Sequence, residues 1–102
     1  MAKYVFAYHG GGMAETEEEM AQVMAQWEAW YAELGDSIVD GGNPFGQTRN
    51  VDSNGVTGPN NSPVTGYTVI TAADIDAAVA AAKGSPILAA GGSVEVAEAI
   101  EM

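Results

Sequence analysis

The side chain best suited to acid–base chemistry in this sequence is its single histidine, His9, since the chain has no cysteine. An imidazole titrates near neutral pH without help, whereas a carboxylate, lysine or tyrosine needs a strongly shifted pKa to do so. His9 follows the apolar segment 4–8 and precedes three glycines, residues 10–12, which let a ligand approach the backbone. Two interpretations follow: His9 is a general acid or base, or it ends a strand and bonds only to backbone or water.

Asp40 is the carboxylate that we pair with His9 as a candidate catalytic residue. A carboxylate that accepts a hydrogen bond from one imidazole nitrogen fixes the tautomer and leaves the other nitrogen free to move a proton. Asp40 stands between the apolar segment 37–39 and the glycine pair 41–42. The plainer interpretation is therefore a turn residue that accepts hydrogen bonds from nearby backbone amides.

Four further side chains are candidates for ligand binding: Tyr8, Asn43, Arg49 and Tyr67. The tyrosines could place hydroxyl groups in an interior cavity, although tyrosines on a sheet more often serve packing. Arg49 is one of three basic residues and could hold a substrate carboxylate, or it could form a surface ion pair. No cofactor or metal is predicted, because one histidine without cysteine leaves only carboxylate ligands, and the acidic segment 15–19 suits the start of a helix.

Two predicted helices and four main strands must position these side chains. The strands are residues 3–9, 37–39, 67–71 and 94–102. An irregular edge strand is expected over 45–52, and turns and loops over 52–55 and 58–63. A second helix is predicted from about residue 72 to 83, with Thr71 and Asp74 at its start and Gly84 at its end.

The first helix, residues 16–34, has the clearest pattern in the chain. Thr16 and Glu19 form a capping box, and Gly35 ends the helix. Apolar residues recur at three- and four-residue spacing and predict a stripe that packs on the sheet: Met20, Val23, Met24, Trp27, Trp30, Tyr31 and Leu34.

The element order predicts one α+β domain over residues 1–102 with a ferredoxin-like βαββαβ fold, in which two helices cover one face of an antiparallel sheet. Strand 3–9 is apolar on both of its sides, and two helices cover only one face. Because monomers rarely expose a large apolar surface, we expect a homodimer through the uncovered sheet face.

The charge balance excludes some partners. The chain has 14 acidic and 3 basic residues, a formal net charge of −11. Nucleic acid and anionic membrane surfaces are therefore not expected partners, because no basic stripe exists to bind them. The short polar start and the single short apolar strand after it match neither a signal peptide nor a membrane span, so we expect a cytoplasmic location.

The chain resembles the YCII-related family, including its DGPF branch, over nearly its full length. The residues that carry this resemblance are, in chain order, Tyr8-His9-Gly10-Gly11, Trp27-x-x-Trp30, Leu34-Gly35-Asp36, Val39 to Gly46, Thr65-Gly66-Tyr67 and Ala90 to Val96. The resemblance implies a single YCII-related domain with a ferredoxin-like fold that assembles as a dimeric α/β barrel.

The chain departs from both branches of that family at functional positions. Where the DGPF branch has Asp-Gly-Pro-Phe-x-Glu-Thr-Lys, residues 42–49 read Gly-Asn-Pro-Phe-Gly-Gln-Thr-Arg, so the acidic residues of the motif are missing at Gly42 and Gln47. The YCII branch implies a His–Asp pair and lyase- or isomerase-like chemistry, with the histidine on the first helix. Residues 24–27 contain no histidine, so that role is not carried over.

Two functions remain open from the sequence. The first is a non-catalytic dimer that binds a small ligand in a pocket of the barrel. The alternative is a lyase- or isomerase-like enzyme in which His9 is the general acid or base and Asp40 orients it.

Overall fold

Two long strands, β1 (Ala2–His9) and β5 (Val64–Ala72), form the centre of a four-stranded antiparallel sheet in the computed structural model, which describes residues 1–12 and 14–102. The strand order is β2-β5-β1-β6, with β2 (Ile38–Asp40) and β6 (Ser93–Ala99) at the two edges. The predicted fold class is confirmed at this level: the chain is α+β, with two helices and an antiparallel sheet, compatible with a ferredoxin-like fold.

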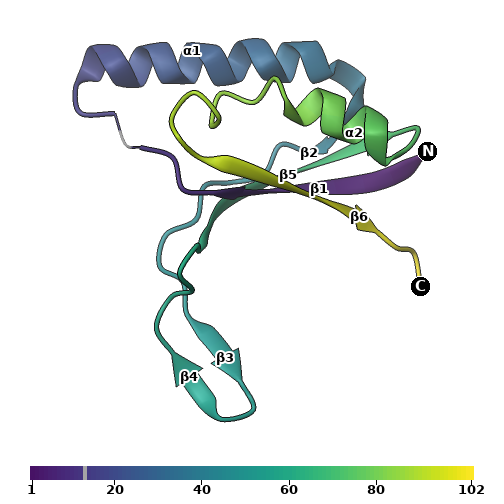
Figure 1. The fold of residues 1–102 in the computed structure, drawn as a ribbon. Helices are drawn as coiled ribbons and strands as arrows, with labels where there is room; N and C mark the ends of the chain where they lie inside the picture. The colour runs from purple at the N-terminus through teal and green to yellow at the C-terminus, as the bar shows by residue number, and fades with distance from the viewer. Residues whose placement is uncertain (13) are drawn as a thin grey trace.

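Both helices, α1 (Glu17–Leu34) and α2 (Ile75–Ala82), cover the same face of this sheet (Figure 1). Side chains alternate across β1, so that every second residue points toward the helices. The core lies between the two layers, and Phe6 at its centre stacks on Trp30 of α1 with ring centroids 5.9 Å apart. Its largest members are the buried aromatic and aliphatic residues Tyr4, Phe6, Tyr8, Trp30 and Ile70.

Helix α1 begins and ends where the sequence predicts. The backbone N–H of Glu19 donates to Oγ1 of Thr16 (3.1 Å), which caps the first turn. Gly35 follows the last turn with a φ of 54°, and its N–H donates to the carbonyl of Tyr31. A short 3₁₀ helix, η1 (Gly35–Ser37), then leads into β2.

The predicted buried stripe of α1 is wrong in its first half. Met20, Val23 and Met24 are 54%, 40% and 59% exposed, whereas Trp30 is buried. An 18-residue helix is about 27 Å long at 1.5 Å per residue. Its N-terminal turns extend beyond the edge of the sheet (Figure 1), so the apolar side chains there have no layer to pack against.

Element boundaries differ from the prediction at three other places. β5 begins at Val64 and continues to Ala72, so α2 starts only after Asp74, whose Oδ1 accepts from the backbone N–H of Ala77 (2.8 Å). β6 ends at Ala99. The alternation of buried residues persists through Ala72, which is why β5 outlasts the predicted strand.

The segment between β2 and β5 carries a hairpin in place of the expected edge strand. β3 (Asn50–Asp52) and β4 (Gly55–Thr57) pair with each other as a separate two-stranded sheet. We call residues 50–57 the arm. Pro44 makes only an isolated bridge to Gly66. Proline lacks an N–H and interrupts the ladder, and after one further bond, from the Phe45 N–H to the carbonyl of Thr65 (2.9 Å), the chain leaves the sheet.

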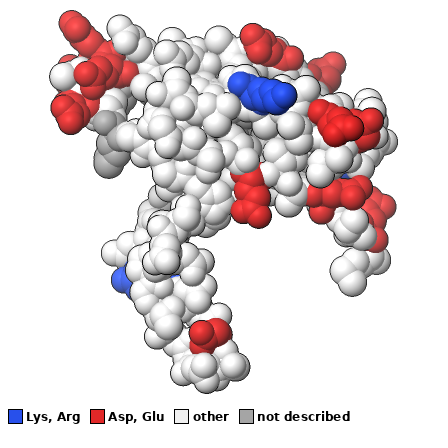
Figure 2. All heavy atoms as spheres, viewed as in Figure 1, with Lys and Arg blue, Asp and Glu red and all other residues white. Residues whose placement is uncertain are grey.

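The arm projects on the side of the sheet opposite the helices (Figure 1), and Figure 2 shows it as a narrow protrusion from the body of the molecule. That side of the sheet, which we call the open face, carries the odd-numbered residues of β1. Val5 lies there between Val69 and Ala97, and Ala7 lies between Tyr67 and Glu95. Within residues 1–12 and 14–102, no helix is long and apolar enough to cross a membrane.

Candidate functional site

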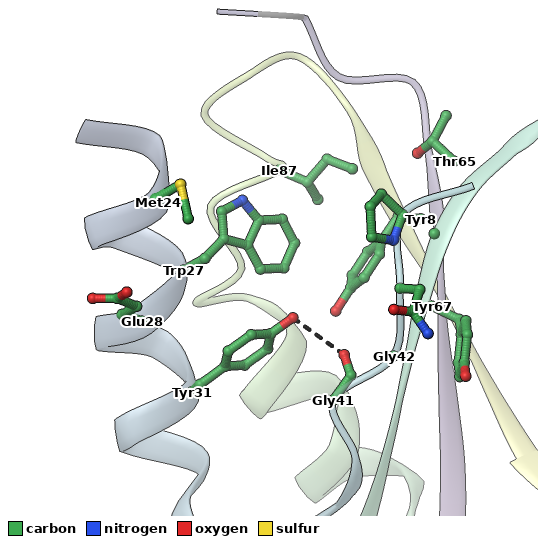
Figure 3. Close-up of a pocket in the computed structure, with 13 residues that line it drawn as sticks. Tyr8, Met24, Trp27, Glu28, Tyr31, Gly41, Gly42, Thr65, Tyr67 and Ile87 are labelled. Atoms are coloured by element: carbon green, nitrogen blue, oxygen red, sulfur yellow. Dashed lines mark hydrogen bonds between the residues drawn. The ribbon is translucent and has the colours of Figure 1, made fainter. Parts of the chain in front are cut away.

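A cavity of about 420 Å³ opens between α1 and the chain segment that follows β2 (Figure 3). Its walls are mostly apolar side chains and glycine backbone. This volume falls within the range of small-molecule sites, about 300–1,000 Å³. The lining residues are Tyr8, Met24, Trp27, Glu28, Tyr31, Gly41, Gly42, Asn43, Pro44, Thr65, Gly66, Tyr67 and Ile87.

Three aromatic rings form one side of the cavity. Their positions follow from the spacing of residues along helix α1 and from the alternation of side chains along β1. Trp27 and Tyr31 are four residues apart on α1 and therefore lie on one side of the helix. Tyr8 belongs to the helix-facing set of β1, and its ring meets Trp27 edge to face at 5.2 Å. Opposite Tyr8 in the β1–β5 register stands Gly66, where a Cβ would come within 3.2 Å of the carbonyl oxygen of Asn43. Glycine therefore lets residues 43–44 lie close to β5 and face the rings.

The back wall is fixed by hydrogen bonds that converge on the carbonyl oxygen of Gly41. The Tyr8 hydroxyl donates to Oγ1 of Thr68 (2.6 Å), and the Thr68 hydroxyl donates to Gly41 (3.1 Å). The Tyr31 hydroxyl donates to the same carbonyl (3.2 Å) and links α1 to this segment (Figure 3). Burial raises the pKa of Tyr8 well above its ordinary value, so its phenol stays protonated as a donor.

We call residues 41–44 the corner, and glycine is required at its second position. Gly42 has a φ of 79°, a left-handed conformation that disfavours other residues. A Cβ built at Gly42 would collide with the carbonyl oxygen of Tyr67. The Gly42 N–H donates to Oδ1 of Asp40 (2.8 Å). The corner thus lies directly on β5 and forms a close-fitting wall.

The structure brings three of the candidate residues together at this corner. The Tyr67 hydroxyl donates to Oδ2 of Asp40 (3.0 Å), and its ring stacks on Phe45 at 5.6 Å. The pKa of Tyr67 is raised, first by the hydrogen bond to Asp40 and then by the negative charge of Asp40 and by desolvation. A hydrogen bond with the Asn43 side chain offsets part of this rise. The Tyr67 ring extends away from the aromatic rings of α1 (Figure 3), toward the open face.

The structure joins the two candidate catalytic residues, His9 and Asp40, to different partners, and no hydrogen bond links them among the described residues. Nδ1 of His9 lies 2.8 Å from the carbonyl oxygen of Ser62, and Nε2 lies 3.1 Å from Oε1 of Glu95. Asp40 bonds at the corner instead. The reason is the strand order, because β5 separates β1 from β2. His9 is also absent from the cavity lining.

Arg49 lies apart from the cavity as well. Its Nη1 donates to the carbonyl of the preceding residue, Thr48 (2.7 Å), just before β3. Tyr8, Asn43 and Tyr67 are among the residues that line the cavity, but the Tyr67 ring and hydroxyl are directed toward the open face and Asp40.

Sequence reasoning missed the α1 side of the cavity. Trp27 and Tyr31 were assigned to the core because their spacing matches a helix stripe. The available signal was Gly66, because a glycine opposite Tyr8 lets the backbone of Asn43 and Pro44 lie against β5 as the wall that faces the rings.

In the part of the chain that the structure describes, no group of three or more His, Asp or Glu residues is placed to hold a metal ion. Comparison with family models and with curated proteins found no match to this chain.

Proposed function

We propose that the protein binds a small, uncharged and largely apolar molecule in the cavity between α1 and the corner. The observation that carries this proposal is the aromatic wall of Tyr8, Trp27 and Tyr31 around about 420 Å³ of space. Aromatic rings offer large apolar surfaces and prefer flat partners in stacked or edge-to-face contact. A planar ligand, or one with an aromatic ring, fits that wall best.

The charges around the cavity support the same ligand class. Glu28 is the single charged residue among those that line it, and its carboxylate points away from the rings (Figure 3). An anion in this cavity would be buried without a cationic partner, which is costly. The net charge of −11 adds long-range repulsion. Both arguments disfavour substrates that carry a carboxylate or phosphate.

We also propose that the protein works as a homodimer through its open face, as the resemblance to YCII-related dimeric α/β barrels implies. Support comes from the row Val69, Val5 and Ala97, three apolar side chains side by side on that face. A second copy placed sheet to sheet would bury this row by two-fold symmetry.

The alternative, a lyase- or isomerase-like enzyme with His9 as general acid or base, is less favoured by the geometry. Both ring nitrogens face acceptors, the Ser62 carbonyl and the Glu95 carboxylate. His9 is also absent from the cavity lining, so a ligand in the cavity does not meet its imidazole. His9 would have to release one partner before it could exchange a proton with a substrate.

A matched pair of dyes tests the ligand class. Phenylnaphthylamine is neutral and aromatic, and anilinonaphthalenesulfonate adds one sulfonate to the same rings. We expect the neutral dye to bind at least tenfold more tightly in a fluorescence titration. Trp27→Ala should weaken its binding at least tenfold, because the variant removes a cavity wall.

Met20→Ala is the matched control, since Met20 is exposed on the same helix outside the cavity. Equal affinity for the two dyes would contradict the ligand class. Equal affinity of Trp27→Ala and Met20→Ala for the neutral dye would contradict the site.

A further inference from the structure

The arm exposes apolar side chains that its own chain does not cover. Val51 and Val56 stand directly opposite each other across the hairpin, and each is 70% exposed. Isolated two-stranded hairpins are marginally stable in water and normally pack against further strands or a helix. Within the described residues the arm pairs only with itself. It therefore lacks a packing partner.

The position of the arm indicates where such a partner lies. The arm projects from the open-face side (Figure 1), and Figure 2 shows a recess between it and the rest of the body. The radius of gyration is 14.7 Å, whereas a compact chain of this length has about 13 Å. Any molecule placed on the open face would lie beside the arm and could cover Val51 and Val56.

The distribution of charge favours a second copy of this chain as that partner. Most acidic residues belong to α1, α2 and the segments next to them, including the run 15–19. Two of the three basic residues, Lys3 and Arg49, belong to β1 and to the base of the arm. Figure 2 shows several acidic groups on the helical layer, together with one basic group there, and both a basic and an acidic group on the arm.

This contrast matters because two copies with a charge of −11 each repel one another through most of their surfaces. On the open face and the arm, Lys3 and Arg49 offset part of the charge of Asp40, Asp52, Glu95 and the C-terminal Glu101, whereas α1 and α2 carry most of the remaining acidic residues. A strongly basic partner would instead be drawn to the helical layer. The open side is thus where self-association meets least repulsion.

We propose that the arm is an intersubunit clamp, in which each copy lays Val51 and Val56 against the second copy on its open face. The inference rests on the homodimer proposed above. Under two-fold symmetry the contact occurs twice, so each substitution in the arm affects two contacts.

The first test measures the dimer dissociation constant by sedimentation. The unmodified protein should sediment as a dimer of the 10.5 kDa chain at micromolar concentration. Val56→Lys should raise the dissociation constant at least tenfold, because it places an ammonium group in the contact. The variant should still fold, since Val56 is 70% exposed. Met20→Lys adds the same charge to an exposed position of α1 and should leave the constant unchanged.

The second test uses the absence of cysteine from the chain. A single Val56→Cys substitution accepts a benzophenone maleimide, which forms a bond to nearby C–H groups under light. We expect a covalent dimer, with the attachment mapped to a peptide of the second copy. Met20→Cys, labelled in the same way, should give none.

The outcomes separate the proposals. A dimer that Val56→Lys weakens no more than Met20→Lys does would overturn the clamp and leave the dimer and the ligand site in place. A protein that stays monomeric at micromolar concentration would overturn both the dimer and the clamp. The cavity is formed by residues of a single chain, so the dye titration tests the ligand site independently of the dimer.

Discussion

The chain leaves the sheet at the corner, residues 41–44, and returns to it through residues 58–63, and the two passages are held in different ways. The corner is fixed by hydrogen bonds from Tyr31 and Thr68 to Gly41. The returning passage is held by an exposed contact, Nδ1 of His9 with the carbonyl of Ser62. Part-buried bonds fix the wall of the cavity, whereas an exposed contact holds the passage that returns from the arm less firmly.

The largest loss of stability should come from Gly42→Ala, because the backbone of the corner lies closest to β5 at this residue. The substitution combines a left-handed φ with a collision against Tyr67, and we expect it to cost about 3 kcal/mol of unfolding free energy. Urea denaturation followed by circular dichroism measures it.

Gly46→Ala is the matched control in the same segment, because an added Cβ there would have nothing within 4 Å. It should change the free energy of unfolding by less than about 0.5 kcal/mol. Similar costs for the two alanine variants would contradict the close contact between the corner and β5.

A smaller effect is expected from Tyr8→Phe, which removes a buried hydroxyl from the network behind the cavity. Loss of its 2.6 Å bond to Thr68 should cost about 1–2 kcal/mol. Tyr31→Phe removes a part-buried bond and should cost about 0.5–1 kcal/mol. The reverse order in denaturation experiments would contradict this account of the wall.

Alkaline pH should weaken the same network. The pKa of Tyr8 is raised in the folded chain above the value of about 10 that tyrosine has when unfolded. Its contribution to stability is therefore complete below about pH 10 and is lost as the pH rises toward the folded pKa. Denaturation midpoints measured from pH 8 upward should fall above about pH 10, and Tyr8→Phe should show a shallower fall. If the midpoints of the unmodified protein and of Tyr8→Phe fall equally above about pH 10, the ionisation of Tyr8 is not the cause of the loss.

The smallest effect should come from His9→Gln in the returning passage. Its partner Glu95 is 69% exposed, so water and salt screen the pair. We expect a change in unfolding free energy within about 0.5 kcal/mol at neutral pH, and a smaller one still in high salt. A cost comparable to that of Tyr8→Phe would mean that both passages are held equally firmly.

Local signals predicted much of the fold. Thr16, Glu19 and Gly35 bound the first helix as their capping chemistry requires. The order of helices and strands indicated the sheet and its two-helix layer. Periodicity failed at Met20 and Met24, because it identifies the apolar side of a helix but not how far the partner sheet extends.

The candidate site depends on tertiary structure to a greater degree. Tyr8 and Asn43 lie at the cavity, and their role in ligand binding stays a prediction. The pairing of His9 with Asp40 depended on strand order, which no local pattern specifies. Trp27 had the spacing of a core residue, and spacing does not tell whether the volume beside a ring is filled.

The two indoles of the chain lie close together on α1, with ring centroids 5.6 Å apart, yet they have different surroundings. Trp27 borders the cavity, and Trp30 is buried with its Nε1 bonded to Ala81 (3.1 Å). Ultraviolet emission from the unlabelled protein therefore carries two signals at once. Quenching or a blue shift of the emission reports a ligand beside Trp27. A red shift reports that water has reached Trp30.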